Sequence, residues 1–185
     1  MSIVRFQTWM GILLSVMLFS PASAEAAGGW SGNANVFLGG KFMDSNDWSP
    51  AQDQFETGLL LDVEPPPLPV SLAADFLFGF SSGAGIDVQV NEYDLGIRKI
   101  FEMIPLVHPY LGGGVSIETA ELSSGGASID DTGVGYWLEG GLMTHVLTIL
   151  NLGLDLRYSS ASVKISGFNV NPGGFHVGLI TGLHW

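Results

Sequence analysis

The chain has 185 residues, of which 46% are hydrophobic, and its 18 acidic and 6 basic side chains give a formal net charge of −12. With so few bases it has no positive surface for a phosphate backbone, which excludes a nucleic-acid partner. The absence of cysteine excludes a disulfide framework, a thiolate metal site and a cysteine nucleophile.

Residues 1–24 have the pattern of a cleavable secretory signal peptide. Arg5 supplies a positive start, Met10 to Phe19 form an apolar core, and Ala22-Ser23-Ala24 provides small residues for cleavage. Residues 25–185 then form one domain on length alone. They contain no further apolar run of roughly 20 residues, which a membrane helix needs. Any crossing of a membrane must therefore use strands.

Eight segments of alternating apolar and polar residues follow, separated by turn-forming residues. This spacing is typical of an all-β barrel or sandwich. The expected strands are Trp30–Phe42, Asp53–Val63, Pro69–Phe80, Asp87–Lys99, Pro109–Thr119, Gly133–His145, Asn151–Ala161 and Gly173–Trp185.

The links between these strands are of two kinds. The second, fourth and sixth are compact and contain Pro or aliphatic residues, as Glu64-Pro-Pro-Pro-Leu68 does. The first, third, fifth and seventh are rich in Ser, Gly, Asp and Asn: Met43–Gln52, Ser81–Ile86, Ala120–Thr132 and Ser162–Pro172. Two ends of different character fit the long extracellular loops and short periplasmic turns of a transmembrane barrel.

Aromatic residues recur at one level of these strands. If the apolar face of each strand points outward, six strands carry an aromatic side chain on that face at the loop end. Aromatic rings prefer the headgroup zone of a membrane. We therefore expect an interface girdle of Phe42, Phe55, Phe80, Tyr136, Tyr158 and Phe175.

The opposite face is charged and rich in glycine. Burying unpaired charges in a dry core is costly, whereas a hydrated lumen accepts them. The residues predicted to form a lumen charge network are Glu56, Asp75, Glu92, Asp94, Arg98, Glu139, Asp155 and Arg157, with Lys41, Asp62 and Glu118 on the same face. An eight-stranded barrel is just wide enough for its own side chains, so we expect these charges to plug the lumen. A soluble barrel with the apolar face inside remains an alternative.

The fourth expected strand departs from the regular alternation. Its apolar residues change parity: Ile86, Val88 and Val90 share one face, and Tyr93, Leu95 and Ile97 share the other. A β-bulge at Asn91-Glu92 would restore a common apolar face.

The last expected strand carries Leu179, Thr181, Leu183 and Trp185 on one face. This strand, together with Pro109-Tyr110-Leu111-Gly112-Gly113-Gly114 and Asn151-Leu-Gly-Leu-Asp-Leu-Arg-Tyr158, resembles the small eight-stranded outer-membrane β-barrels. These include the OmpA-type transmembrane domain, the OmpX-like proteins and the broad outer membrane protein β-barrel domain. The resemblance covers nearly all of residues 25–185.

The resemblance implies an eight-stranded antiparallel up-and-down transmembrane β-barrel in the cell outer membrane. Its partners would be outer-membrane lipid and lipopolysaccharide, and we expect a monomer. It also implies insertion by the barrel assembly machinery, which in this family reads a final strand that ends in an aromatic. By position, the assembly signal is Leu179, Thr181, Leu183 and Trp185.

The function expected is a structural or surface-interaction role without catalysis. A narrow cation-selective pore is one alternative, and a lipid A-modifying enzyme is another. Lipid A deacylases use a His-x-Ser arrangement, but no Ser follows two residues after His108, His145, His176 or His184. We therefore assign no catalytic residue.

No metal or cofactor is expected either. His145 and His184 point inward near the periplasmic rim by parity, and Asp62 or Asp94 could supply a third ligand. Their strands are not neighbours, however, and lone histidines in a lumen are commonly hydrogen-bonded groups.

Overall fold

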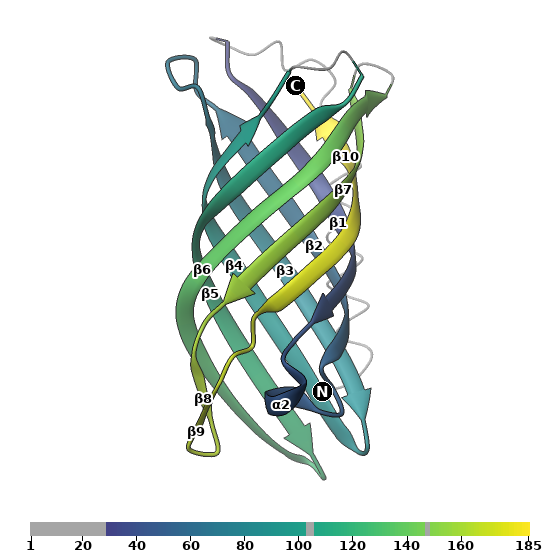
Figure 1. Ribbon diagram of the computed structural model, residues 1–185, viewed down its shortest axis with the longest axis vertical. Helices are drawn as coiled ribbons and strands as arrows, with labels where there is room; N and C mark the ends of the chain where they lie inside the picture. The colour runs from purple at the N-terminus through teal and green to yellow at the C-terminus, as the bar shows by residue number, and fades with distance from the viewer. Residues whose placement is uncertain (1–28, 103–105, 147–148) are drawn as a thin grey trace.

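The computed structural model describes residues 29–102, 106–146 and 149–185, so the predicted signal peptide lies outside the described residues. Within these ranges eight long strands close into a barrel, accompanied by one short helix and a small hairpin (Figure 1). The barrel strands are β1 Ser31–Phe42, β2 Asp53–Glu64, β3 Ser71–Gly83, β4 Ile86–Ile100, β5 His108–Ser124, β6 Ala127–Val146, β7 Leu150–Ser160 and β10 Gly174–His184. The remaining elements are α2 Ser45–Trp48, β8 Val163–Ile165 and β9 Phe168–Val170.

Each barrel strand pairs antiparallel with its neighbours in the ring order β1-β10-β7-β6-β5-β4-β3-β2. The pairing of β1 with β10, from Asn33↔His184 to Phe42↔Phe175, closes the ring. This confirms the predicted up-and-down barrel. Among the described residues, no helix has the length and apolarity needed to cross a membrane.

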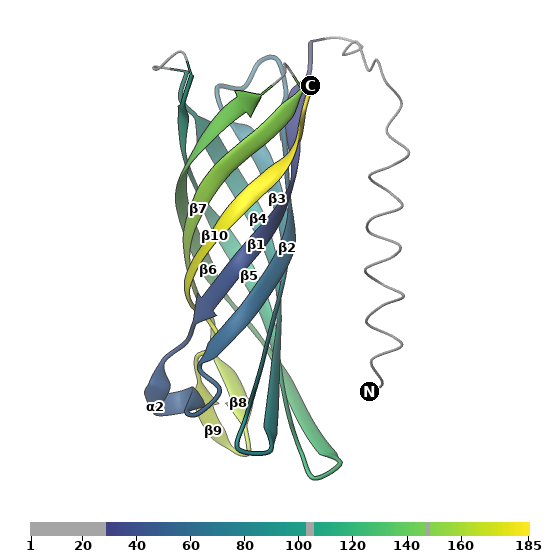
Figure 2. The same ribbon diagram turned by 90° about the vertical axis from the view of Figure 1, so that its right-hand side faces the viewer.

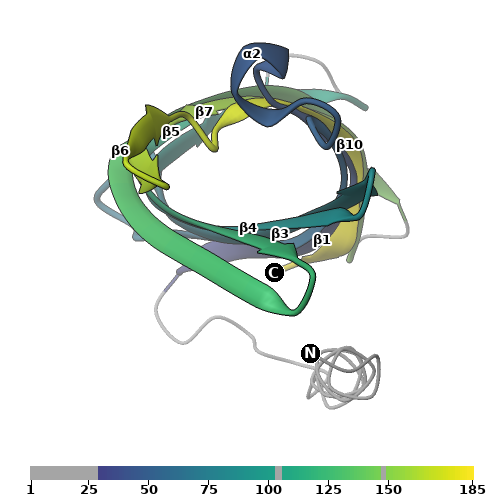
Figure 3. The same cartoon turned by 90° about the horizontal axis from the view of Figure 1, so that it is seen from below.

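The two ends of the barrel differ. We call the end that carries α2 and the β8–β9 hairpin the loop end, and the end where β10 finishes the turn end (Figure 2). Seen along the barrel axis, α2 and β8–β9 lie on the rim of the loop end (Figure 3). The hairpin of β5 and β6 reaches furthest at the loop end (Figure 1).

The side chains alternate between the lumen and the outside, as the period of two in the sequence predicts. In β7, Asp155 and Arg157 are buried, whereas Leu154 and Leu156, which alternate with them, are 53% and 58% exposed. Leucine, valine and aromatic side chains are exposed in the same way around the barrel. Such a continuous apolar surface needs an apolar environment.

Two links predicted as irregular loops are instead extensions of paired strands. β3 and β4 remain paired as far as Gly83↔Ile86, and β5 and β6 as far as Ser124↔Ala127. Both hairpins turn through two residues with positive φ, Ala84-Gly85 and Gly125-Gly126. Two-residue turns of this conformation match the twist of paired strands. The sequence did not predict these strand extensions, because segments with polar residues on both faces have the composition of a loop.

The predicted bulge at Asn91-Glu92 is wrong. The ladder runs without interruption through Phe78↔Asn91 and Leu77↔Glu92 on one side, and equally regularly on the other. The parity changes because the environment changes. Val88 and Val90 point into the barrel and are buried, while the outward positions beside them are polar where the hairpin extends past the outer apolar surface.

The valines belong to an apolar cluster at the loop end. Its buried members are Met43, Trp48, Ala51, Val88, Val90, Ala120 and Val163. The indole Nε1 of Trp48 donates a hydrogen bond to the Asn171 carbonyl at 2.6 Å, which fixes α2 against the chain after β9. A second apolar cluster inside the barrel takes residues from six strands: Phe37, Leu60, Leu77, Tyr110, Met143 and Ile180.

Candidate functional site

The charged side chains of the barrel interior are the strongest candidate site. Among the described residues, eight carboxylates and three permanent bases are buried. They include every residue of the predicted lumen charge network and also Lys41, Asp62 and Glu118. Together with the buried Ser159 and His176, they form two groups. The arginine cluster is Arg98, Arg157, Asp62, Asp75, Asp94, Glu139 and Asp155, and the lysine cluster is Lys41, Glu56, Glu92, Glu118, Ser159 and His176.

Arg157 occupies the centre of the arginine cluster. Its guanidinium donates hydrogen bonds to Asp75, to Asp94 and, at 2.7 Å, to Glu139 Oε2. The same group lies over the Trp137 ring, 4.8 Å from the centroid. Charge-assisted bonds from a planar fork and contact with an aromatic face both favour Arg over Lys at this position.

Arg98 joins the same carboxylates from β4. It donates to Asp62 at 3.1 Å, to Asp75 at 2.8 Å and to both carboxylate oxygens of Glu139. Asp75 and Glu139 therefore each bridge two guanidinium groups. This shared bridging links β3, β4, β6 and β7 across the lumen, and the bond from Arg98 to Asp62 adds β2.

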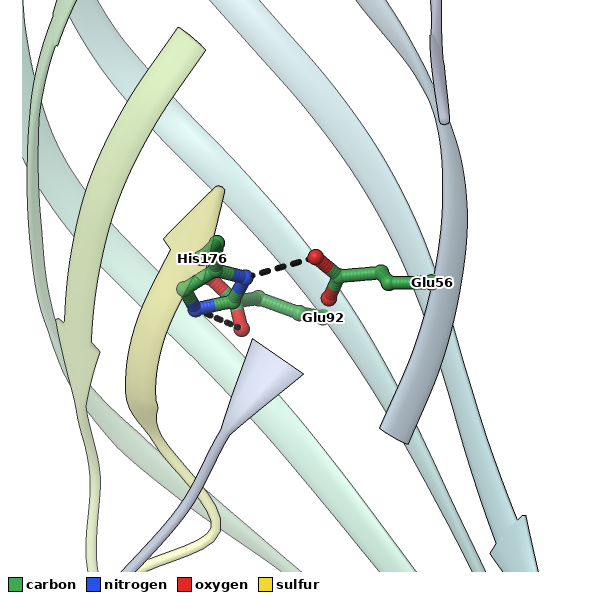
Figure 4. Close-up of side chains that lie close together, drawn as sticks. All are labelled: Glu56, Glu92 and His176. Atoms are coloured by element: carbon green, nitrogen blue, oxygen red, sulfur yellow. Dashed lines mark hydrogen bonds and ion pairs between the residues drawn. The ribbon is translucent and has the colours of Figure 1, made fainter. Parts of the chain in front are cut away.

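The lysine cluster lies closer to the loop end. Nζ of Lys41 is 2.7 Å from Glu92 Oε2 and 3.6 Å from Glu118 Oε2. Nδ1 of His176 lies 2.7 Å from Glu56 Oε2, and its Nε2 lies 3.7 Å from Glu92 (Figure 4). Sequence reasoning did not assign His176 to the lumen, although its parity with Gly178, placed inward, could have done so.

Three residues of this cluster have the spacing of a catalytic triad. Ser159 Oγ lies 3.0 Å from His176 Nε2, and His176 Nδ1 lies 2.7 Å from Glu56. The Ser159 hydroxyl also lies 3.0 Å from Glu92 Oε2. Because an ionised carboxylate only accepts, the Ser159 hydroxyl donates its hydrogen to Glu92. The hydrogen is therefore not directed at Nε2, as activation of a serine nucleophile by histidine requires.

The surroundings of these residues also oppose catalysis. Ser159 is completely buried, and it lines neither the cavity at the turn end nor the smaller cavity beside Leu60. We therefore interpret the arrangement as a buried hydrogen-bond network.

Glu56, Glu92 and His176 also place three ligand atoms within 4.8 Å of one another, a spacing compatible with a metal ion. The Lys41 ammonium, however, already occupies Glu92 Oε2. All three residues are buried between the apolar cluster at the loop end and the rest of the lumen. A metal ion would have to displace a resident cation here, so the donor set fits a metal poorly.

The six aromatics of the predicted girdle point outward. Rings on adjacent strands come together at 5.5 Å between Phe55 and Phe80, and at 5.1 Å between Tyr158 and Phe175. Tyr136 lies 6.2 Å from Tyr158, and Phe42 pairs with Phe175 across β1 and β10. Their location in a headgroup zone remains a prediction.

The residues of the predicted assembly signal lie on the outer side of β10 and its end. Leu179 and Thr181 are exposed, Leu183 is half-buried, and Trp185 is 44% exposed. The backbone of Trp185 exchanges two hydrogen bonds of 3.1 Å with Gly32. The signalling role of these residues remains a prediction.

Three histidines lie together at the turn end. The His145 ring is stacked between His108 at 4.4 Å and His184 at 4.0 Å, measured between ring centroids. His145 and His184 lie on strands that are not neighbours, because β7 lies between them, but the narrow barrel brings their imidazole rings together. Asp62 lines the same cavity, whereas Asp94 is bound to Arg157 in the arginine cluster.

No family model matches the chain, and no curated protein matches it. Among solved structures, Neisserial surface protein A is 17% identical and has a TM-score of 0.59, covering 84% of this chain and 95% of that one. Ail, the attachment invasion locus protein of Yersinia pestis, is 14% identical with a TM-score of 0.56, covering 84% and 98%.

A third similar structure is the outer membrane protein OprG from Pseudomonas aeruginosa. It is 13% identical with a TM-score of 0.52, and the match covers 84% of this chain and 95% of that one. Together with the closed ring of strands, these matches show that the chain has the fold of the small eight-stranded outer-membrane β-barrels.

Proposed function

We propose that the protein is an integral outer-membrane barrel without catalytic activity, whose lumen is closed by its own side chains and whose loop end binds partners outside the cell. The outward apolar surface supports membrane insertion, because about 9–11 residues of each strand suffice to cross a bilayer. In this orientation the turn end faces the periplasm.

The observation that carries the closed lumen is the bridging of Arg98 and Arg157 by Asp75 and Glu139. These contacts join opposite sides of the barrel. Apolar side chains also fill the lumen, with Trp48 in the cluster at the loop end and Tyr110 in the second cluster, where its hydroxyl donates to Asp155 at 2.6 Å. An eight-stranded barrel leaves little room beyond its own side chains.

A role in surface interaction is supported by the order of the loop end. The amide of Asn171 donates to Asp47 at 3.1 Å, and the amide of Lys164 donates to Asp131 at 2.6 Å. These bonds join α2 and the β8–β9 hairpin to the rest of the loop end. A preformed surface loses less entropy on binding than a flexible loop does. Two proteins of similar fold are named for the cell surface and for attachment.

A narrow cation pore is the second candidate, and the excess of buried carboxylates over bases favours it. Rings of acidic side chains select cations in other channels. The two candidates differ in conductance. If the lumen is closed, the purified barrel in a planar bilayer should give no channel events. If it is a pore, it should give cation-selective events, and a large porin serves as the positive control.

Location and catalysis are tested separately. Heat-modifiable migration in unboiled gels and recovery in the outer-membrane fraction are expected for a folded barrel in that membrane. Mass spectrometry of lipid A from cells with and without the protein should give identical spectra. A modified lipid A species that depends on the protein would contradict the non-enzymatic role.

A further inference from the structure

We propose that the turn end of the barrel binds a divalent transition-metal ion through the histidine stack, which consists of His108, His145 and His184. The inference is independent of the closed lumen and of any surface partner. It rests on the geometry of the rings, the charge around them and the cavity beside them.

The fold brings the three imidazoles together from β5, β6 and β10. Adjacent rings are nearly parallel, with interplanar angles of 20° and 18°. They line a cavity of about 470 Å³ at the turn end. Imidazole is a preferred ligand of Zn²⁺, Cu²⁺ and Ni²⁺ but not of Mg²⁺ or Ca²⁺. The donor set therefore selects a transition metal.

The stack has to rearrange before it can act as a ligand set. A metal–nitrogen bond of about 2.0–2.1 Å with tetrahedral angles requires ligand nitrogens about 3.3 Å apart. The separations of 4.0 and 4.4 Å are between the centroids of neighbouring, nearly parallel rings, so His108 and His184 flank His145 and all three rings must rotate before their lone pairs converge. His145 is exposed at the barrel mouth, and the adjoining cavity leaves room for this rearrangement.

The cavity is also electrostatically suited to a cation. Its charged lining consists of Asp62, Glu64, Glu102 and Lys99. Asp62 is already paired with Arg98, so Glu64 and Glu102 against Lys99 supply the excess of negative charge. Nδ1 of His108 is buried and makes no hydrogen bond among the described residues. A buried nitrogen without a partner is uncommon in native structures, and a bound ion or its water would provide one.

Access distinguishes this site from the group of Glu56, Glu92 and His176. The histidine stack borders a cavity at the mouth of the barrel, whereas the other group is buried and its Glu92 is bound by Lys41. The two groups share no residue. Substitutions can therefore separate them.

The test uses the untagged full barrel, refolded in detergent micelles, with Zn²⁺, Cu²⁺ and Ni²⁺ as probes and Mg²⁺ as the hard-cation control. Equilibrium dialysis should find about one tightly bound transition-metal ion and no tight Mg²⁺ binding. His145→Asn should weaken binding roughly tenfold or more. Glu56→Gln, which alters the buried group, should leave it unchanged, and heat-modifiable migration checks that both variants fold.

A second readout identifies the ligands directly. The electron paramagnetic resonance spectrum of bound Cu²⁺ should show coupling to at least two nitrogens, and one of these should disappear in His145→Asn. Binding should weaken as the pH is lowered, because protons compete with the metal for the imidazole nitrogens. Absence of tight binding, or binding that survives His145→Asn but is lost in Glu56→Gln, overturns the proposal.

Discussion

Lys41 and Glu92 form an ion pair inside the barrel, with 2.7 Å between Nζ and Oε2 and at most 1% of either side chain exposed. The two residues lie 51 positions apart in the chain, on β1 and β4, which are not neighbours in the ring. The pair therefore connects opposite walls of the lumen, and its removal should affect the whole barrel.

Lys41→Met should destabilise the barrel by about 3–5 kcal/mol, because it leaves Glu92 buried without its cation. Lys41→Met combined with Glu92→Gln should recover a substantial part of this loss, since the uncompensated charge is then gone. Urea unfolding of the refolded protein in lipid vesicles measures both variants. Losses that simply add in the double variant would show that the two side chains do not interact.

A charge on the outer face should be costly where the strand crosses the membrane. Leu154→Arg, at an outward position of β7 that is 53% exposed, should lose about 2–4 kcal/mol of folding free energy in vesicles. The matched control is Phe168→Arg in the β8–β9 hairpin, where the side chain is 74% exposed. That variant should remain close to the parent, and equal effects at the two positions would reject the assignment of the lipid face.

Ser159→Ala tests the hydrogen-bond interpretation of the lysine cluster. Removing the hydroxyl deletes its bonds to Glu92 and His176 and should cost about 1–3 kcal/mol of stability. The lipid A of cells carrying the variant should match that of cells carrying the parent protein. A protein-dependent lipid A change that disappears in the variant would instead identify Ser159 as a nucleophile.

Much of the fold could be predicted from the sequence, because the period of two assigns each residue to one face of a strand. That rule assigns Asp75, Glu139, Arg98 and Arg157 to the inward face, and all four side chains are buried. It could not predict that Asp75 and Glu139 each bridge both arginines, because partners across a barrel depend on the tilt and stagger of the strands.

The errors have a common physical origin. At Val88 and Val90 the lumen becomes apolar just where the outer face becomes polar. The predicted bulge rested on the expectation that apolar residues face outward along the whole strand. The proximity of His145 to His184 could not be predicted from strand order, because their strands are not adjacent in the barrel. Their imidazole rings meet across the narrow mouth of the barrel.

Trp185 is predicted to act in assembly more than in stability. Full burial of a large apolar side chain contributes roughly 1.5–3 kcal/mol, and Trp185 is 44% exposed, so its side chain contributes less. Trp185→Ala also keeps the backbone bonds to Gly32. The purified variant should therefore refold in detergent with a midpoint of urea unfolding close to that of the parent.

In cells the same variant should reach the outer membrane at a much lower level, since the assembly machinery would no longer recognise the last strand. Trp30→Ala is the matched control, because Trp30 is an aromatic of similar exposure, 48%, next to the start of β1 and outside the last strand. Its outer-membrane level should stay close to that of the parent. Normal levels of Trp185→Ala would refute the signal, and equal losses in both variants would point to a general need for aromatics at the turn end. Failure of Trp185→Ala to refold in vitro would make its role mainly structural.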